Sequence, residues 1–288
     1  MNPLLIGNQI KIDHLDQYAA IIGEAPSKGA RSPKLWNAVF KDCKLNCEMV
    51  PMDVDNKNII NLLNDLNEDQ RFVGGAIAYP YKEVVANWLA NKITPEAKKI
   101  GAVNCLYRDS NGELKGTNTD GEASLVTFNN RFGSLQSKSI MILGLGGAGK
   151  AVASYFASNA DSVIIISRSL DGKKYAEKIN ASWRWWGEIS NHINMVDIVV
   201  NCTSIGFGDQ EKESPLSEEH VVSMKKTAII FDIIYQPLKT KLLEIASNSN
   251  IAVFNGLEMN LEQAVLAYQY AIKPEKDLNT IRQIMMSS

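Results

Sequence analysis

The stretch Ser139-Ile-Met-Ile-Leu-Gly-Leu-Gly-Gly-Ala-Gly-Lys150 says more about the fold than any other part of this chain. A short apolar run ends in a cluster of glycines, and a segment rich in Ala and Val follows. This is the order of a strand, a tight turn and a helix. Glycine permits positive φ and lets a phosphate approach the backbone without meeting a Cβ atom, and the first N–H groups of a helix attract an anion. The stretch therefore predicts a dinucleotide site at Gly144, Gly146, Gly147, Ala148 and Gly149, with a purely structural turn as the alternative.

The residues after the next apolar run indicate which dinucleotide binds. Val163–Ile166 has the length of a strand, and Ser167, Arg168 and Ser169 follow it. An NAD site usually carries Asp or Glu at this place, where it holds the ribose 2′-hydroxyl. Asp171 falls beyond the strand end. A guanidinium can bind a 2′-phosphate through two parallel hydrogen bonds. The pattern favours NADP over NAD, and an ordinary solvated loop arginine is the alternative.

Composition excludes several other classes of function. The chain has 288 residues, with Lys+Arg 30 and Asp+Glu 32, so its formal net charge is only −2. No basic footprint for nucleic acid is present, and no apolar run approaches the roughly 20 residues that cross a membrane. The N-terminus lacks a basic-then-apolar signal pattern. Cys43, Cys47, Cys105 and Cys202 are scattered thiols without metal-ligand spacing, so we expect a cytoplasmic protein with no metal, no membrane partner and no nucleic-acid partner.

Strand-like and helix-like patterns alternate along the whole chain, which predicts an α/β fold with parallel sheets covered by helices. An apparent hairpin, 103–107 with 114–116, interrupts the first half. Two long helical patterns, 257–272 and 277–286, close the chain, and we expect them to pack on the first domain. The other predicted segments are 18–22, 33–42, 47–50, 56–66, 72–78, 81–89, a helix from 122 onward, 198–201, 228–233, 241–246 and 251–254.

A series of short motifs resembles the shikimate dehydrogenase family over nearly the whole length from Tyr18. The motifs stand in the order of the family, and their joint spacing is far more specific than any one of them. They are Ser32-Pro33 with Asn37, Pro80-Tyr-Lys82-Glu83, Gly101-Ala-Val-Asn104, Asn118-Thr-Asp120-Gly121, the glycine turn, Ser167-Arg-Ser169, Asn201-Cys-Thr-Ser-Ile-Gly206, Asp232-Ile-Ile-Tyr235-Gln-Pro237, and Gly256-Leu-Glu-Met259 with Gln263.

The resemblance implies two domains with a cleft between them: a substrate-binding and catalytic domain, 1–120 plus 257–288, and a Rossmann-type NADP-binding domain, 121–256. It implies reversible hydride transfer between NADP and the C3 position of a cyclohexene carboxylate. It also implies a monomer or homodimer whose partner is a small cyclic hydroxy acid. The site residues carried over are catalytic Lys82 and Asp120, substrate-binding Ser32, Asn104, Tyr235 and Gln263, and cofactor-binding Thr203 and Gly256 beside the glycine and arginine positions.

Lys82 and Asp120 are the candidates for proton transfer. Oxidation of a secondary alcohol removes a hydride from carbon and a proton from oxygen, and the protein must handle the proton. An ammonium favours the ionised form of a neighbouring carboxyl group, and desolvation lowers the pKa of a lysine. Taken alone, Lys82 at a helix start is more typical of a solvated surface residue, and Asp120 before Gly121 of a helix cap. The family motifs around both residues favour the catalytic interpretation.

The predicted substrate pocket departs from the family at three places. The family usually has Ser-x-Ser-Pro where this chain has Ala30-Arg31-Ser32-Pro33, and Asn-Val-Thr where it has Ala76-Ile-Ala78. Each missing hydrogen bond to a buried substrate group is worth about 1–3 kcal/mol, so shikimate is expected to bind poorly unless Arg31 grips its carboxylate. Arg31 could equally point to solvent.

Two classes of function are therefore open. The first is an NADP-dependent dehydrogenase for shikimate or a related ring acid, which the retention of Lys82 and Asp120 favours. The second is a catalytically weak NADP-binding sensor or partner protein, which the loss of polar pocket groups favours. Another two-domain Rossmann reductase fits the continuous motif set less well. We interpret Trp183, Trp185 and Trp186 as a packed surface edge, and Cys202 as a packing residue.

Overall fold

The described residues form two compact units. The computed structural model describes residues 2–288. One unit holds the described residues up to Thr119 together with Leu261–Ser288, and the other is Asp120–Asn260. The predicted boundaries placed Asp120 and 257–260 in the first domain, and the structure places both in the second unit. Asp120 opens helix α5 (Asp120–Phe132), which packs on α6 (Gly147–Ala157), and Glu258 forms an ion pair of 3.1 Å with Arg131 of α5.

The first unit is built on a five-stranded sheet in the order β2-β1-β3-β4-β5. The first three strands in sequence are parallel, whereas β4 and β5 form an antiparallel hairpin. The hairpin that the sequence predicted at 103–107 and 114–116 is therefore confirmed, and it makes the sheet of this unit mixed, because its short turn joins neighbouring antiparallel strands directly. The strands are β1 (Gln17–Gly23), β2 (Cys47–Asp53), β3 (Phe72–Ile77), β4 (Cys105–Arg108) and β5 (Leu114–Thr117).

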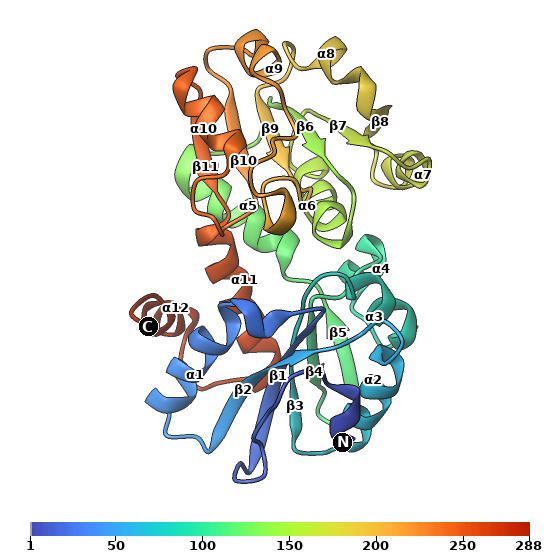
Figure 1. The fold of residues 1–288 in the computed structure, drawn as a ribbon, viewed down its shortest axis with the longest axis vertical. Helices are drawn as coiled ribbons and strands as arrows, with labels where there is room; N and C mark the ends of the chain where they lie inside the picture. The colour runs from blue at the N-terminus through green and yellow to red at the C-terminus, as the bar shows by residue number, and fades with distance from the viewer. Residues whose placement is uncertain (1) are drawn as a thin grey trace. The chain divides into compact units, whose positions relative to one another are not determined.

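Side chains along β1 point alternately to the two faces of the sheet, and an apolar layer covers each face. Tyr18, Ala20 and Ile22 belong to one buried cluster, and Ala19 and Ile21 belong to the other, because successive strand residues face opposite ways. Helices α2 and α3 cover the first face, while α1, α12 and the C-terminal part of α11 cover the second (Figure 1). These helices are α1 (Ser32–Asp42), α2 (Ile59–Glu68), α3 (Lys82–Leu89), α11 (Leu257–Ile272) and α12 (Leu278–Met286), and the short helices are η1 (Pro3–Leu5), η2 (Pro26–Lys28) and α4 (Pro95–Ile100).

The second unit contains a six-stranded sheet in the order β11-β10-β9-β6-β7-β8, and every pair in it is parallel. This is the strand order of the Rossmann fold, which the glycine turn predicted. The edge strand β8 was not predicted as a strand, because the alternation in its sequence Ser-Trp-Arg-Trp extends over only four residues. The strands are β6 (Ser139–Leu143), β7 (Ser162–Ser167), β8 (Ser182–Trp185), β9 (Ile198–Asn201), β10 (Ile229–Asp232) and β11 (Ala252–Asn255).

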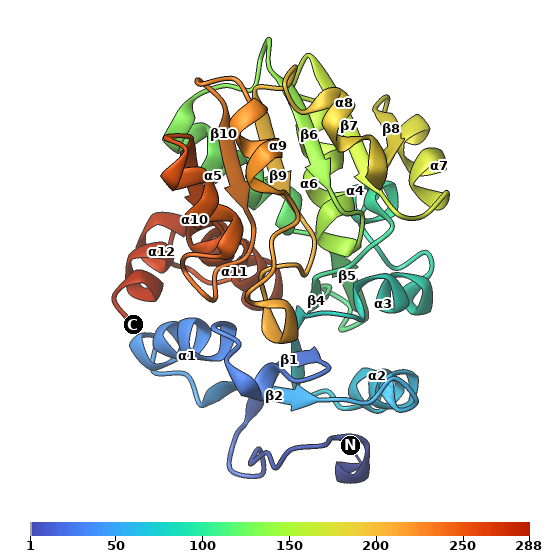
Figure 2. The ribbon, with the colours of Figure 1, turned by 45° about the horizontal axis from the view of Figure 1, so that its top comes forward.

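Helices cover both faces of this second sheet (Figure 2). Ile230 of β10 packs with residues of α9 and α10 on one face. The next residue, Phe231, faces the other way and meets Phe128 of α5, whose ring also meets Phe156 of α6. The remaining helices are α7 (Asp171–Lys178), α8 (Ile189–His192), α9 (Glu218–Ser223) and α10 (Lys241–Asn248), with short turns η3 (Trp186–Glu188) and η4 (Gly208–Gln210).

Candidate active site

Two glycines of the predicted dinucleotide turn are required by close packing. Gly144 follows β6 with φ of +90°, and a Cβ atom there would lie 2.8 Å from Cγ2 of Thr203. A Cβ at Gly149 would lie 2.6 Å from the Gly144 carbonyl oxygen. Larger residues would therefore push the start of α6 away from the end of β6. The sequence motif is explained first by this tight strand–turn–helix connection.

Gly146 has a different role, because nothing lies within 4 Å of a Cβ built on it. It precedes the first residue of α6, Gly147, and adopts an extended conformation. Ala148 stands in the first turn of α6. The first N–H groups of this helix have no partners within the helix, so a diphosphate fits the open space beside Gly146. The residues present therefore fit a bound dinucleotide.

Arg168 follows β7 and is exposed. Among residues 2–288, no hydrogen bond or ion pair holds its guanidinium. No acidic residue ends β7, since Asp171 is the first residue of α7. Ser169 is held in the turn by the Asp171 backbone N–H, which donates to Ser169 Oγ at 3.2 Å. The loop therefore presents a cation where a 2′-phosphate is expected.

Asn201 at the end of β9 shapes the loop that carries Thr203. The backbone N–H and the hydroxyl of Thr203 both donate to Asn201 Oδ1, at 3.0 and 2.7 Å. The Ile205 N–H in turn donates to Thr203 Oγ1 at 3.1 Å. Thr203 also packs against Gly144. The structure therefore brings the predicted cofactor residue Thr203 next to the glycine turn.

A buried carboxylate at the end of the neighbouring strand was not singled out from the sequence. Asp232 is fully buried and accepts hydrogen bonds from Thr240 Oγ1 at 2.7 Å, from the Ile234 N–H at 3.1 Å and from Asn201 Nδ2 at 3.1 Å. Burial raises the pKa of Asp232 to about 6, although the three donors oppose the shift. The strand-end position of Asp232 in its motif was the available signal.

The same segment carries Tyr235 and is braced by Gly256. A Cβ atom at Gly256 would lie 1.9 Å from the Ile233 carbonyl oxygen, and the Gly256 N–H donates to the Ile234 carbonyl at 3.0 Å. Glycine is therefore required here by backbone packing, whatever its part in cofactor binding. Tyr235 is half-buried within this loop.

In the first unit, the Asn104 side chain is buried and held on both sides. Its Oδ1 accepts the Thr119 N–H at 2.8 Å, and its Nδ2 donates to Thr119 Oγ1 at 3.0 Å and to Gln263 Oε1 at 3.4 Å. The Thr119 hydroxyl also lies 3.1 Å from the Gln263 carbonyl oxygen. The structure thus brings together two of the four predicted substrate-binding residues, Asn104 and Gln263.

The two predicted catalytic residues each begin a helix. Lys82 is half-buried at the start of α3, and its carbonyl accepts the Val103 N–H at 2.9 Å, which places it beside Asn104. Asp120 is buried at the start of α5 and directly follows Thr119. They belong to different units, so the pairing of their side chains stays a prediction.

The three alanines of the predicted pocket lie at one apolar cluster. Ser32 is buried in the first turn of α1. Ala76 is a member of the cluster that contains Trp36, and Ala30 and Ala78 pack against it. The Trp36 indole fills the layer between α1 and α11 and donates to the Ala264 carbonyl at 3.2 Å.

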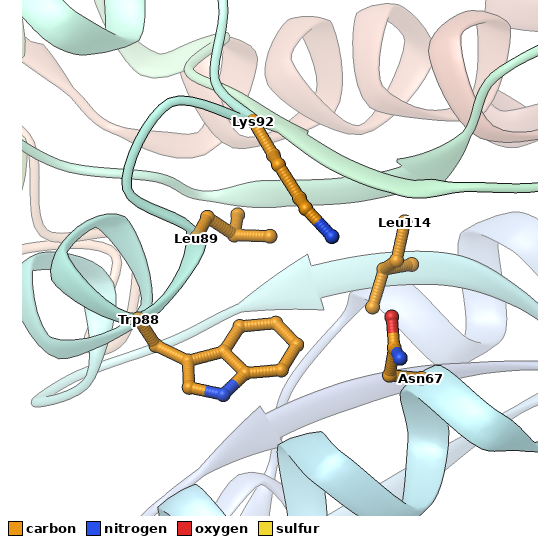
Figure 3. Close-up of a pocket in the computed structure, with 5 residues that line it drawn as sticks. All are labelled: Asn67, Trp88, Leu89, Lys92 and Leu114. Carbon is orange, nitrogen blue, oxygen red and sulfur yellow. The ribbon is translucent and has the colours of Figure 1, made fainter.

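A hollow of about 200 Å³ also lies in the first unit, but it is lined by none of the predicted site residues. Figure 3 shows Trp88, Lys92 and Asn67 around it, with Leu89 and Leu114. Lys92 is paired with Glu113 at 2.8 Å, and the Trp88 N–H donates to Asn64 at 3.0 Å. These polar groups are already paired within the protein.

The described residues include no group of three or more His, Cys, Asp or Glu side chains arranged to hold a metal ion. Within the same residues, no helix has both the length and the apolar character to cross a membrane.

The Rossmann sheet, its glycine turn and the exposed arginine define the class: a two-unit α/β oxidoreductase with a dinucleotide-binding unit. The chain belongs to the shikimate dehydrogenase family. The family described as "Shikimate dehydrogenase substrate binding domain" matches residues 21–106. The family described as "Shikimate / quinate 5-dehydrogenase" matches residues 127–253.

Individual relatives agree over nearly the full length. The chain is 32% identical over 252 residues to the shikimate dehydrogenase (NADP(+)) of Clostridium beijerinckii, covering 87% of this chain and 90% of the relative. A crystal structure of a shikimate dehydrogenase in complex with NADP+ has a TM-score of 0.80 at 28% identity, covering 94% and 95%. That of a shikimate 5-dehydrogenase from Listeria monocytogenes, in complex with shikimate and NAD, has a TM-score of 0.79 at 26% identity, covering 96% and 99%.

Proposed function

We propose that this protein catalyses reversible, NADP-dependent hydride transfer at a ring hydroxyl or keto group of shikimate and 3-dehydroshikimate, or of a related cyclic hydroxy acid. The observation that carries the proposal is the held carboxamide of Asn104. Thr119 and Gln263 fix it beside the first turn of α3, where Lys82 stands. A preorganised amide next to a lysine suits the recognition of a ring hydroxyl at the point where its proton leaves.

Side chains of the protein must accept and return the proton of the reacting hydroxyl. When bound, the nicotinamide accepts the hydride from the substrate carbon. Lys82 and Asp120 then hold the substrate hydroxyl and take its proton during oxidation, or return it during reduction. The buried position of Asp120 strengthens any interaction that its carboxylate makes with a nearby ammonium.

The remaining predicted contacts orient the ring acid and the cofactor. Asn104 and Gln263 offer amide groups, and Ser32 and Tyr235 offer hydroxyls, to the substrate. Arg168 selects NADP because its exposed guanidinium, just after β7, binds a 2′-phosphate. NAD has no 2′-phosphate for it to bind. Relatives named as NADP(+) enzymes, and a solved relative in complex with NADP+, support this cofactor.

The apolar cluster beside the predicted pocket favours a substrate with fewer hydroxyls than shikimate. Ala30, Ala76 and Ala78 present methyl groups where the family usually presents hydrogen-bonding side chains, and all three pack at one cluster. Restoring Ala30→Ser, Ala76→Asn and Ala78→Thr together should raise kcat/KM for shikimate, since each restored bond contributes about 1 kcal/mol. A wild-type KM for shikimate in the micromolar range would contradict this part of the proposal.

A second candidate is a catalytically weak NADP-binding sensor or partner protein, and the same alanine cluster is the observation that favours it. The two candidates separate in one assay. Hydroxylated ring acids, including shikimate and quinate, are offered with NADP and with NAD, and cofactor reduction is followed. The dehydrogenase turns over at least one ring acid with NADP, and Lys82→Ala lowers that turnover by about 10²–10⁴-fold. Tight NADPH binding without turnover of any ring acid would favour the sensor.

A further inference from the structure

A side chain of the edge strand β8 holds the loop that carries Arg168. The indole N–H of Trp183, on β8, donates to Ser167 Oγ at 2.8 Å. The Ser167 hydroxyl donates in turn to the Ser169 carbonyl at 3.1 Å. A serine hydroxyl has one hydrogen to donate and two lone pairs, so this chain of bonds uses it as both acceptor and donor. The residues on either side of Arg168 are thereby linked to each other and to a large, half-buried ring.

Helix α7 closes over this chain of bonds, and Gly172 makes the closure possible. A Cβ atom on Gly172 would lie 2.5 Å from Ser167 Oγ and 2.7 Å from Nε1 of Trp183. The Gly172 N–H also donates to the Ser169 carbonyl at 3.1 Å, so this one carbonyl receives both the hydroxyl and the first turn of α7. The absence of a side chain at position 172 therefore leaves room for the contact between Trp183 and Ser167.

The consequence is a rigid turn with a single exposed residue of positive charge at its tip. Ser167 is only 5% exposed, whereas Arg168 is exposed. A flexible loop would lose conformational entropy on closing around an anion, whereas a loop fixed in advance loses little. The smaller entropy loss strengthens binding of the group that Arg168 contacts, the 2′-phosphate, which NADP has and NAD lacks.

The geometry points to Trp183 as a positioning residue for cofactor selection: through Ser167 and Ser169 it holds Arg168 where a 2′-phosphate binds. This inference rests on the proposed function, because it assumes that NADP is the cofactor. The tryptophan acts through the loop and is not assigned a contact with the cofactor. The T-shaped contact of its ring with that of Trp185, at 4.8 Å between centroids, helps to hold the indole in this orientation.

The test compares the dissociation constants for NADPH and NADH, measured by titration calorimetry on the full chain. Trp183→Phe removes the N–H donor and keeps an aromatic ring, and Ser167→Ala removes the bridging hydroxyl. Gly172→Ala disrupts the same contact with both partners present. A net hydrogen bond of about 0.5–1.5 kcal/mol corresponds to roughly 2- to 12-fold, so each variant should weaken NADPH by a factor in that range and leave NADH unchanged.

A matched control comes from the other unit. Trp88→Phe also removes an indole N–H that donates to a side chain, that of Asn64 at 3.0 Å, but it lies in the first unit. It should leave both dissociation constants as in the wild type. The thermal midpoint of each variant shows whether it folds. Because three variants break the same contact in different ways, the remaining two still test the inference if one of them fails to fold.

The possible results are distinct. A ratio of NADH to NADPH dissociation constants that falls in the three variants and holds in Trp88→Phe supports the inference. If all folded variants keep the wild-type preference for NADPH, or bind both cofactors more weakly by the same factor, the positioning role of Trp183 is overturned. The proposal that NADP is the cofactor is then unaffected. A wild-type chain that binds NADH as tightly as NADPH overturns the proposed cofactor, and with it the basis of the inference.

Discussion

Replacing Asp232 by Asn should change how the stability of the second unit depends on pH. The pKa of Asp232 is raised from 3.8 to about 6 by burial. The folded chain therefore keeps this proton to higher pH than the unfolded chain does. Its contribution to the free energy of unfolding is most favourable below about pH 4 and falls as the pH rises through about 6. A shift of about two pKa units corresponds to roughly 3 kcal/mol in total.

The variant retains most of the hydrogen bonds and loses the titration. In Asp232→Asn, Oδ1 can still accept the Ile234 N–H and the Asn201 amide, and Nδ2 can donate to the Thr240 hydroxyl. Stability relative to the wild type should therefore rise by roughly 2 kcal/mol between about pH 4.5 and pH 7.5. Hydrogen exchange of the β9 and β10 amides, corrected for intrinsic rates, reports this unit separately.

Asp197 in the same unit provides a control of opposite sign. Although burial opposes the shift, hydrogen bonds from Lys225 at 2.7 Å and from Ser139 lower the pKa of Asp197 to about 2. The stability it contributes is lost only as the pH falls from about 4 to about 2. Asp197→Asn should therefore differ from the wild type by the same amount at both pH values. A flat difference for Asp232→Asn as well would refute the burial argument.

Three further outcomes are expected. Arg168→Ala should weaken NADPH by about 1.5–3 kcal/mol, the range for a charged hydrogen bond, and equal loss for NADH in the same titration would count against a 2′-phosphate contact. Lys82→Ala and Asp120→Asn should each lower kcat by about 10²–10⁴-fold, and the double variant should lose less than the product, whereas a fully multiplicative loss would show independent action. Arg282→Ala should cost about 3 kcal/mol in urea denaturation because it strands the buried Glu262, which Arg282 holds at 2.7 and 2.8 Å; a loss below about 1 kcal/mol would place the pair with surface ion pairs.

The dinucleotide-binding unit could be predicted because its signals are local. The glycine turn after β6 and the apolar run of β7 each encode a conformation within a few residues. Gly146 and Gly149 looked alike in the sequence, and only the structure separates the open position from the packed one. The family motifs likewise brought Asn104 and Gln263 into one set, and the structure shows them in hydrogen-bond contact.

The parts that sequence reasoning missed depend on distant contacts. Strand β8 forms because its backbone pairs with β7, and the alternation of its own four side chains is too short to mark a strand. The acceptor role of Asp232 arises from Asn201, 31 residues away, and from Thr240. The bond from Trp183 to Ser167 joins neighbouring strands in the same way. Burial of a polar group is set by tertiary packing, so no local pattern marks it.

An isotope label can show whether this chain moves a hydride between a ring carbon and NADP. Shikimate or a related ring acid, deuterated at the carbon that bears the reacting hydroxyl, is incubated with NADP+ and the wild-type chain, and the reduced cofactor is analysed by mass spectrometry. We expect deuterium to appear in NADPH, and we expect the Lys82→Ala variant to form little deuterated NADPH. A chain that binds NADPH tightly but forms no deuterated NADPH with any of the ring acids would contradict the proposed hydride transfer.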